Sequence, residues 1–205
     1  MKMSKVFKIL AVVMAAAFIT IIAVLWDWVQ YKPIDFMEYY FNNKQALTQY
    51  AEKFLDQPNI GNVTRYKSFL GIDYGIKANS MVDNEADKYI SFIVPYNEEP
   101  FWDRGDVTKI SAYHAKEKTL TGFLQRYGIS VEEYLEWRAV LAKYNLTCIT
   151  LSDGPLVDLS VAPDRGFLYR RDPGVSFGYG PKYLQPINKN WAYYDERGID
   201  ADSTD

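Results

Sequence analysis

The longest uncharged stretch of the chain covers residues 9–26, 18 consecutive positions that are nearly all aliphatic or aromatic. As a helix it would be roughly 27 Å long, which nearly crosses the hydrocarbon core of a bilayer. One lysine directly precedes the run, and two tryptophans and a tyrosine end or follow it, as is typical of membrane interfaces. We therefore expect a signal-anchor helix over residues 6–28, in contact with the lipid bilayer, whose interfacial side chains are Lys8, Trp26, Trp28 and Tyr31.

Two other interpretations of this stretch are weaker. A cleaved signal peptide needs a small-residue site after about 7 to 15 apolar residues, but the cluster Ala15–Ala17 follows only six. A buried helix of a soluble domain would leave the flanking charges unexplained. The uncleaved anchor is therefore the preferred interpretation.

The charges around the apolar run predict which side of the membrane each part occupies. Lys2, Lys5 and Lys8 precede it, and Asp27 follows it directly. By the positive-inside bias, residues 1–5 lie in the cytoplasm. We expect a single-pass protein of the cytoplasmic (inner) membrane, with an extracytoplasmic, periplasmic domain over residues 29–195 and a disordered acidic tail over residues 196–205.

The composition of the rest of the chain excludes some functions. Three of the 23 basic residues precede the apolar run and all 26 acidic residues follow it, so the remainder carries a net charge of −6. A net-negative domain is a poor general binder of nucleic acid. Cys148 is the only cysteine, so no intrachain disulfide can form and packing must stabilise the fold.

Apolar residues at helical spacing predict three helices after the anchor. The first has an apolar face from Phe36 to Phe54 and ends at Gln57-Pro58. A short helix over Leu120–Tyr127 ends at a glycine. Ser130 and Glu133 form an S-x-x-E capping box that opens the third.

The strands are expected mainly in the last third of the chain. Lys88–Pro95 is short, β-branched and bounded by polar clusters, whereas "GIDYG" at residues 71–75 is typical of a turn. Short connections between successive strands indicate antiparallel pairing. We expect an α+β fold, with helices on one face of an antiparallel sheet of about four to six strands. The later strands are predicted at Leu146–Leu151, Leu156–Ala162, Phe167–Arg171, Val175–Gly180 and Asn190–Tyr194.

No residue pattern indicates a cofactor, and none has the spacing of a metal site. Three or four nitrogen or sulfur ligands cannot be assembled from His114 and Cys148, the only residues of their types. We interpret His114 as a surface residue and Cys148 as a small buried one. No catalytic constellation is recognisable in the sequence.

Aromatic and basic residues are the candidates for binding. The chain has 17 Tyr, 11 Phe and 5 Trp, and such rings suit both cores and binding faces. Two aromatics lie in the long polar loop after residue 95, and two arginines and a tyrosine lie in the last third. The candidate binding residues are Phe101, Trp102, Arg170, Arg171 and Tyr179.

The leading hypothesis is a non-enzymatic protein-binding module, anchored to the membrane, that captures a protein partner outside the cytoplasm. One version is an immunity or inhibitor protein whose negative surface attracts a basic toxin. One alternative is an envelope hydrolase that acts on glycan through the loop carboxylates Glu98, Glu99, Asp103 and Asp106. Another is a membrane scaffold or phage-type envelope protein that oligomerises through its anchor.

Overall fold

A computed structural model describes residues 11–22, 35–68, 71–79, 88–94, 119–152, 155–178 and 184–196. The chain divides into two units, Met1–Asp35 and Phe36–Asp205. In the first unit the described residues form a helix over residues 11–22. In the second they form a sheet with helices on one face.

The prediction of a membrane-spanning helix over residues 6–28 is contradicted. The helix over residues 11–22 is roughly 18 Å long at 1.5 Å per residue. None of the helices in the described ranges is both long and apolar enough to cross a bilayer. The assignment to the cytoplasmic membrane as a single-pass protein is therefore not supported. The predicted interfacial residues Lys8, Trp26, Trp28 and Tyr31 lie outside the described residues.

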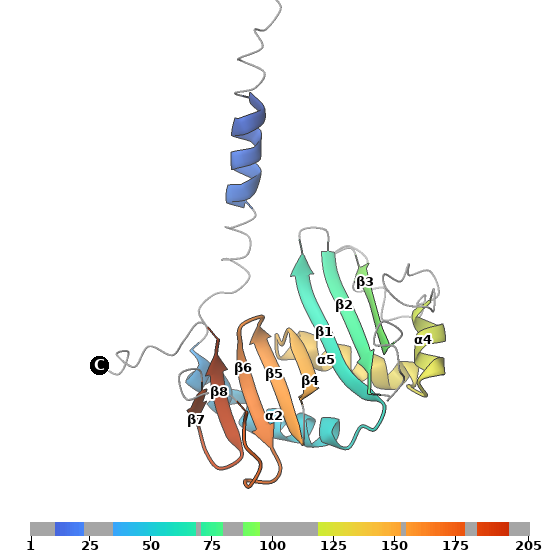
Figure 1. The fold of residues 1–205 in the computed structure, drawn as a ribbon, viewed down its shortest axis with the longest axis vertical. Coiled ribbons are helices and arrows are strands. Elements are labelled where there is room, and N and C mark those ends of the chain that lie inside the picture. The colour runs from blue at the N-terminus through green and yellow to red at the C-terminus, as the bar shows by residue number, and fades with distance from the viewer. Residues whose placement is uncertain are drawn as a thin grey trace, which may run out of the picture. The chain divides into compact units, whose positions relative to one another are not determined.

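The sheet of the second unit contains eight antiparallel strands in the order β3-β2-β1-β4-β5-β6-β8-β7. Figure 1 shows them side by side, with α2 and α5 along one face. Neighbours along the chain are neighbours in the sheet, except that β1 pairs with β4 and β8 lies between β6 and β7. The strands are β1 (Ile60–Ser68), β2 (Gly71–Ala78), β3 (Tyr89–Val94), β4 (Cys148–Ser152), β5 (Leu156–Ala162), β6 (Arg165–Arg170), β7 (Leu184–Pro186) and β8 (Trp191–Asp195).

The expected number of four to six strands is wrong, and β2 accounts for part of the difference. Its sequence contains Gly71 and Gly75, which are typical of turns, yet it pairs with β1 on one side and β3 on the other. A side chain at Gly75 would have no room, because a Cβ there would lie 2.5 Å from Oγ1 of Thr64 and 2.6 Å from the Tyr89 hydroxyl. The glycine therefore serves close packing inside a strand.

The helices follow the sequence signals. They are α2 (Phe36–Leu55), α4 (Leu120–Arg126) and α5 (Val131–Lys143). The capping box of α5 is confirmed, since the Ser130 hydroxyl accepts from the Glu133 N–H at 3.0 Å and Glu133 accepts from the Ser130 N–H. Two orphan N–H groups at the helix start are thereby satisfied.

The main core lies between these helices and the sheet. On α2, Tyr40 packs against Trp191 of β8, with ring centroids 5.6 Å apart, and Phe54 packs against Trp137 of α5 at 5.0 Å. All four rings are almost fully buried. Many of the aromatic residues that the sequence offers for binding are therefore used in packing.

The opposite face of the sheet, here called the outer face, is partly covered by the segment after β6. Phe177 is buried there against Leu156, Leu168, Ala192 and Tyr194. The predicted strand at Val175–Gly180 is therefore wrong for its described residues, 175–178, which form no ladder. An apolar side chain of this segment packs onto a sheet face, and tertiary packing overrides its strand propensity.

Candidate functional site

Of the predicted binding residues, the structure describes Arg170 and Arg171. Phe101, Trp102 and Tyr179 lie outside the described residues. So do His114 and the four loop carboxylates proposed for a hydrolase.

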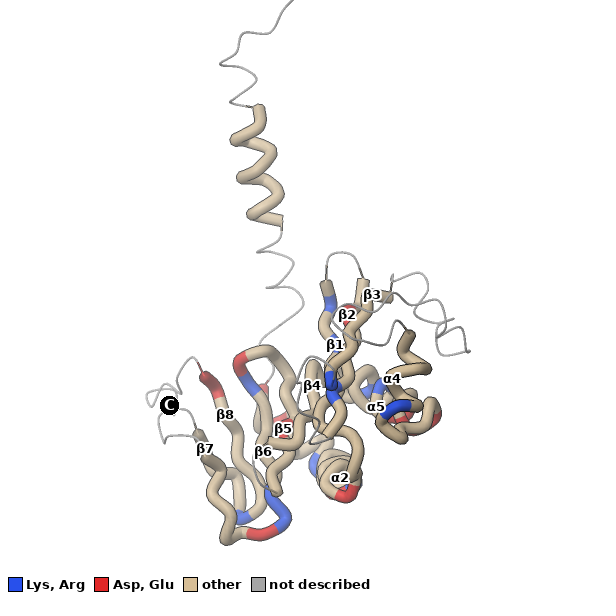
Figure 2. The backbone as a smooth tube through the Cα atoms, turned by 45° about the vertical axis from the view of Figure 1, so that its right-hand side comes forward, with Lys and Arg blue, Asp and Glu red and all other residues tan. Residues whose placement is uncertain are grey.

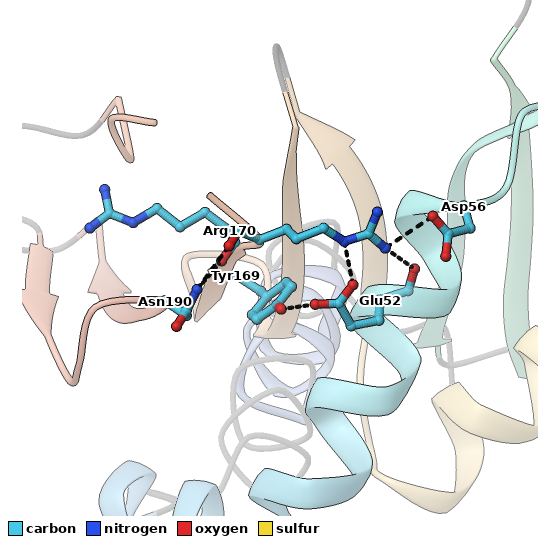
Figure 3. Close-up of polar contacts among 6 residues, drawn as sticks. Glu52, Asp56, Tyr169, Arg170 and Asn190 are labelled. Atoms are coloured by element: carbon cyan, nitrogen blue, oxygen red, sulfur yellow. Dashed lines mark hydrogen bonds and ion pairs between the residues drawn. The ribbon is translucent and has the colours of Figure 1, made fainter. Parts of the chain in front are cut away.

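Arg171 is held by two carboxylates, one on α2 and one directly after its last residue. Its Nη2 lies 3.0 Å from Oδ1 of Asp56, and its Nε pairs with Glu52 (Figure 3). Tyr169 also donates its hydroxyl proton to Glu52. Burial, together with the negative charge of Glu52, raises the pKa of Tyr169 to about 12. The guanidinium of Arg171 is thus already compensated.

Arg170 is used in the same region to hold loops together. Its guanidinium stacks 4.1 Å from the centre of the Phe177 ring. Its Nε donates to the Lys189 carbonyl at 2.9 Å, and its Nη1 donates to the Val175 carbonyl. Asn190 donates to the Arg170 carbonyl, also at 2.9 Å (Figure 3). Because both arginines are engaged within the fold, we place the candidate site beside them rather than on them.

A pocket of about 310 Å³ opens next to these arginines, between α2 and the turn that joins β7 to β8. The almost fully buried rings of two aromatic residues face it from β6 and β8. Lys44 and Thr48 line the pocket from α2, and Lys189 lines it from the turn together with its two asparagine neighbours. The lining residues are Lys44, Thr48, Tyr169, Asn188, Lys189, Asn190 and Trp191.

Hydrogen bonds of Asn188 hold the turn that forms one wall of the pocket. Oδ1 of Asn188 accepts from the N–H groups of Asn190 and Trp191, at 2.9 and 3.1 Å. Nδ2 of Asn188 donates to the Tyr40 hydroxyl at 2.9 Å. These bonds form an Asx turn fixed to α2, with Lys189 at its exposed tip.

The electrostatics of the pocket favour an anion. Lys44 and Lys189 are exposed, and neither forms an ion pair with any residue in the described part of the chain. Glu52, one helical turn beyond Thr48, is neutralised by Arg171. Across the described strands and helices, basic and acidic residues are interspersed (Figure 2). The two lysines therefore make the pocket locally positive in a surface of mixed charge.

An exposed apolar stripe continues from the pocket along α2. Phe41 is 64% exposed and Met37 is 37% exposed. Because positions 37, 41, 44 and 48 are spaced by three or four residues, they share one side of the helix. Phe41 therefore lies one turn from Lys44, at the rim of the pocket.

One sequence signal for this site is the position of Phe41 on α2. Phe41 falls outside the periodic apolar face of α2, whose buried positions are Tyr40, Leu47, Ala51 and Phe54. An aromatic residue on the polar side of an amphipathic helix suggests a contact outside the domain. The part of the pocket formed by the β7–β8 turn had no such signal, because it depends on tertiary contacts.

The environment of Cys148 disfavours its thiolate, the form that acts as a nucleophile. The residue is buried, which confirms our interpretation of it as a small core side chain. Burial raises the pKa of its thiol to about 12. Among the described residues no cluster of His, Cys, Asp and Glu could hold a metal ion.

Comparison with known proteins found no matching family model, no matching curated protein and no matching solved structure. Inferences about function therefore start from the geometry of the pocket and the surfaces around it.

Proposed function

We propose that the Phe36–Asp205 unit is a non-enzymatic protein-binding module that docks an acidic segment of a partner protein at the α2 pocket. The main support for this proposal is that two lysines flank an aromatic pocket beside the exposed Phe41. Neither lysine has an ion-pair partner among the described residues. A carboxylate of the partner would pair with Lys44 and Lys189, and an apolar side chain would cover Phe41. Charge-assisted hydrogen bonds would provide the specificity.

The exposed apolar stripe that continues from the pocket along α2 favours docking of a protein over capture of a small anion. A site for a small anion needs only the lysines and amides, whereas the apolar stripe extends beyond the pocket by two helical turns to Met37. Aromatic residues and Met beside charged rims are enriched at protein interfaces. An inhibitor or immunity protein would be one module of this kind, since it acts by covering a surface of its partner and needs no catalytic residues.

Site-specific photocrosslinking in the native cells tests this proposal. The photoreactive analogue p-benzoylphenylalanine replaces Phe41 in the full-length chain, and in a matched control it replaces Ala139, an exposed position on α5. We expect a discrete crosslinked protein from position 41 only, with the crosslink mapped beside an acidic segment. The doubly reversed variant Lys44→Glu/Lys189→Glu should lose it, because like charges then face each other.

Three outcomes would overturn the proposal. One is the absence of a crosslinked protein specific to position 41, and another is a crosslink that survives both charge reversals. The third is saturable binding of free glutamate or phosphate that depends on the lysines in the absence of any crosslink, which would assign the pocket to a small anion.

A further inference from the structure

One row of small residues crosses the outer face of the sheet. Consecutive pairings connect one residue from each of the eight strands, and six adjacent members are glycine, threonine, cysteine or serine. Rings from Tyr89 and Tyr194 lie over the two glycines of this row, where a Cβ would come within 2.6 Å and 3.0 Å of their atoms. The row is Ser91, Gly75, Thr64, Cys148, Ser160, Gly166, Tyr194 and Leu184.

The next row on the same face is polar at one end and apolar at the other. Its polar end is Lys77, Asn62, Thr150 and Asp158, on four adjacent strands. Its apolar end, from Leu168 onward, belongs to the cluster that Phe177 covers. Asn62, Thr150 and Asp158 are half-buried, so the polar end is accessible from the outer face.

Asp158 lies at the boundary between the two ends and has no counter-charge among the described residues. The Tyr194 hydroxyl lies 3.0 and 3.1 Å from its two carboxylate oxygens, and the Ser160 hydroxyl donates to Oδ1 at 3.1 Å. Within the described part of the chain no Lys, Arg or His pairs with it, and the nearby charge is that of Glu196, which has the same sign. A half-buried carboxylate that is oriented but not neutralised favours a cation.

The neighbouring polar groups also leave acceptors available. Nδ2 of Asn62 donates to two side chains of the neighbouring strand β4, to Oγ1 of Thr150 at 2.6 Å and to Sγ of Cys148 at 2.9 Å. Its amide oxygen has no hydrogen-bond donor among the described residues. Asn62 and Asp158 are two strands apart, so their backbones are separated by roughly 9 Å across the sheet. The amide donor of Asn62 is thus used within the sheet, whereas its amide oxygen and the carboxylate of Asp158 are acceptors on this face.

We propose that Asn62, Thr150 and Asp158 form a second binding site, on the outer face, for a basic side chain of a partner protein. The guanidinium of an arginine or the ammonium of a lysine supplies the positive charge that Asp158 does not receive from the described residues, and its N–H groups match the carboxylate and amide acceptors of this row. This site is separate from the α2 pocket and takes the opposite charge, so it does not depend on the function proposed there.

Nuclear magnetic resonance titration of the isotope-labelled full-length chain tests this site. The probes are N-acetyl-arginine amide and N-acetyl-lysine amide, with N-acetyl-glutamine amide as the neutral control. At neutral pH we expect saturable shifts of the backbone amides of residues 62, 150 and 158 with the basic probes alone. Asp158→Asn should weaken binding roughly tenfold, because it removes a charge-assisted hydrogen bond.

Two further variants make the result specific. Asp73→Asn changes another half-buried carboxylate on β2, on the same face, and should leave the affinity unchanged. Thr150→Arg places a guanidinium next to Asp158 within the chain, so it should occupy the site and abolish binding. The absence of saturable shifts, equal binding of the neutral probe, or equal losses in Asp73→Asn and Asp158→Asn would each overturn the proposal.

Discussion

Tyr194 on β8 donates its hydroxyl proton to the carboxylate of Asp158 on β5, at 3.0 and 3.1 Å from its two oxygens, although β6 lies between these strands. The ring can cross β6 because Gly166, which pairs with Tyr194 on one side and Ser160 on the other, has no side chain. A Cβ at Gly166 would lie 2.7 Å from the Leu159 carbonyl oxygen and 3.0 Å from Cε1 of Tyr194. A glycine at position 166 is therefore required for the hydrogen bond from Tyr194 to Asp158 in the polar site on the outer face.

Gly166→Ala should therefore destabilise the protein by about 1–3 kcal/mol, because the ring and the neighbouring strand must move. The free energy of unfolding in urea measures the effect. Gly61→Ala is the matched control, since the nearest atoms to its Cβ lie 3.5 Å away, at ordinary contact distance. Equal stability of the two variants would show that the close approach at Gly166 is not maintained.

The stability of the protein should depend on the ionisation of Asp158. Burial, offset in part by hydrogen bonds from Tyr194 and Ser160, raises the pKa of Asp158 from 3.8 to about 6, and the charge of Glu196 adds to the rise. Cys148 on β4, another titratable group near Asp158, stays neutral throughout this range, because its pKa of about 12 lies far above it. The folded state therefore binds a proton more tightly than the unfolded chain does.

As pH rises from about 4 to about 6, the wild type should lose about 1–3 kcal/mol of stability relative to Asp158→Asn, and the difference should stay constant above pH 6. Urea unfolding of both proteins across this range provides the measurement. The comparison cancels the titration of the other carboxylates, which both proteins share. A constant difference at all pH values would contradict the raised pKa.

Glu52 links α2 to the end of β6 through Tyr169 and Arg171. Glu52→Gln should lower the free energy of unfolding by about 1 kcal/mol, because the hydrogen bond from the buried tyrosine loses its charged acceptor. The pKa of Tyr169 should fall at the same time, since the neighbouring negative charge is gone. Asp56→Asn is the control: it removes only an exposed ion pair with Arg171, so little change is expected. A loss in Asp56→Asn as large as that in Glu52→Gln would locate the stabilisation in the ion pair instead.

Phe41 and Phe54 lie on the same helix and should behave in opposite ways. Phe41 is 64% exposed, so Phe41→Ala should change stability by no more than about 0.5 kcal/mol. Phe54 is fully buried, and Phe54→Ala should cost about 3–5 kcal/mol through the cavity it leaves. Thermal unfolding of both variants tests this contrast. A large loss in Phe41→Ala would mean that this ring packs within the fold and is not available to a partner.

The local elements of this protein could be predicted from sequence wherever one periodicity or one cap dominated. The apolar spacing of α2, the alternation of β3 and the capping box at Ser130 each depend on residues close in the chain. Such signals arise from the geometry of a single element, so they need no knowledge of its neighbours. The strand count failed at β2, whose glycines are typical of turns, because Gly75 is required there by Thr64 and Tyr89 on the adjacent strands.

The candidate sites show the same division. Sequence alone identified Arg170 and Arg171 as a basic cluster, and tertiary structure decided that Glu52, Asp56 and Phe177 engage them. The pocket and the row around Asp158 combine residues more than 80 positions apart in the chain, so no local pattern could reveal them. The chemical character of each side chain was determined by the sequence, whereas its availability for binding was determined by which neighbours the fold placed against it.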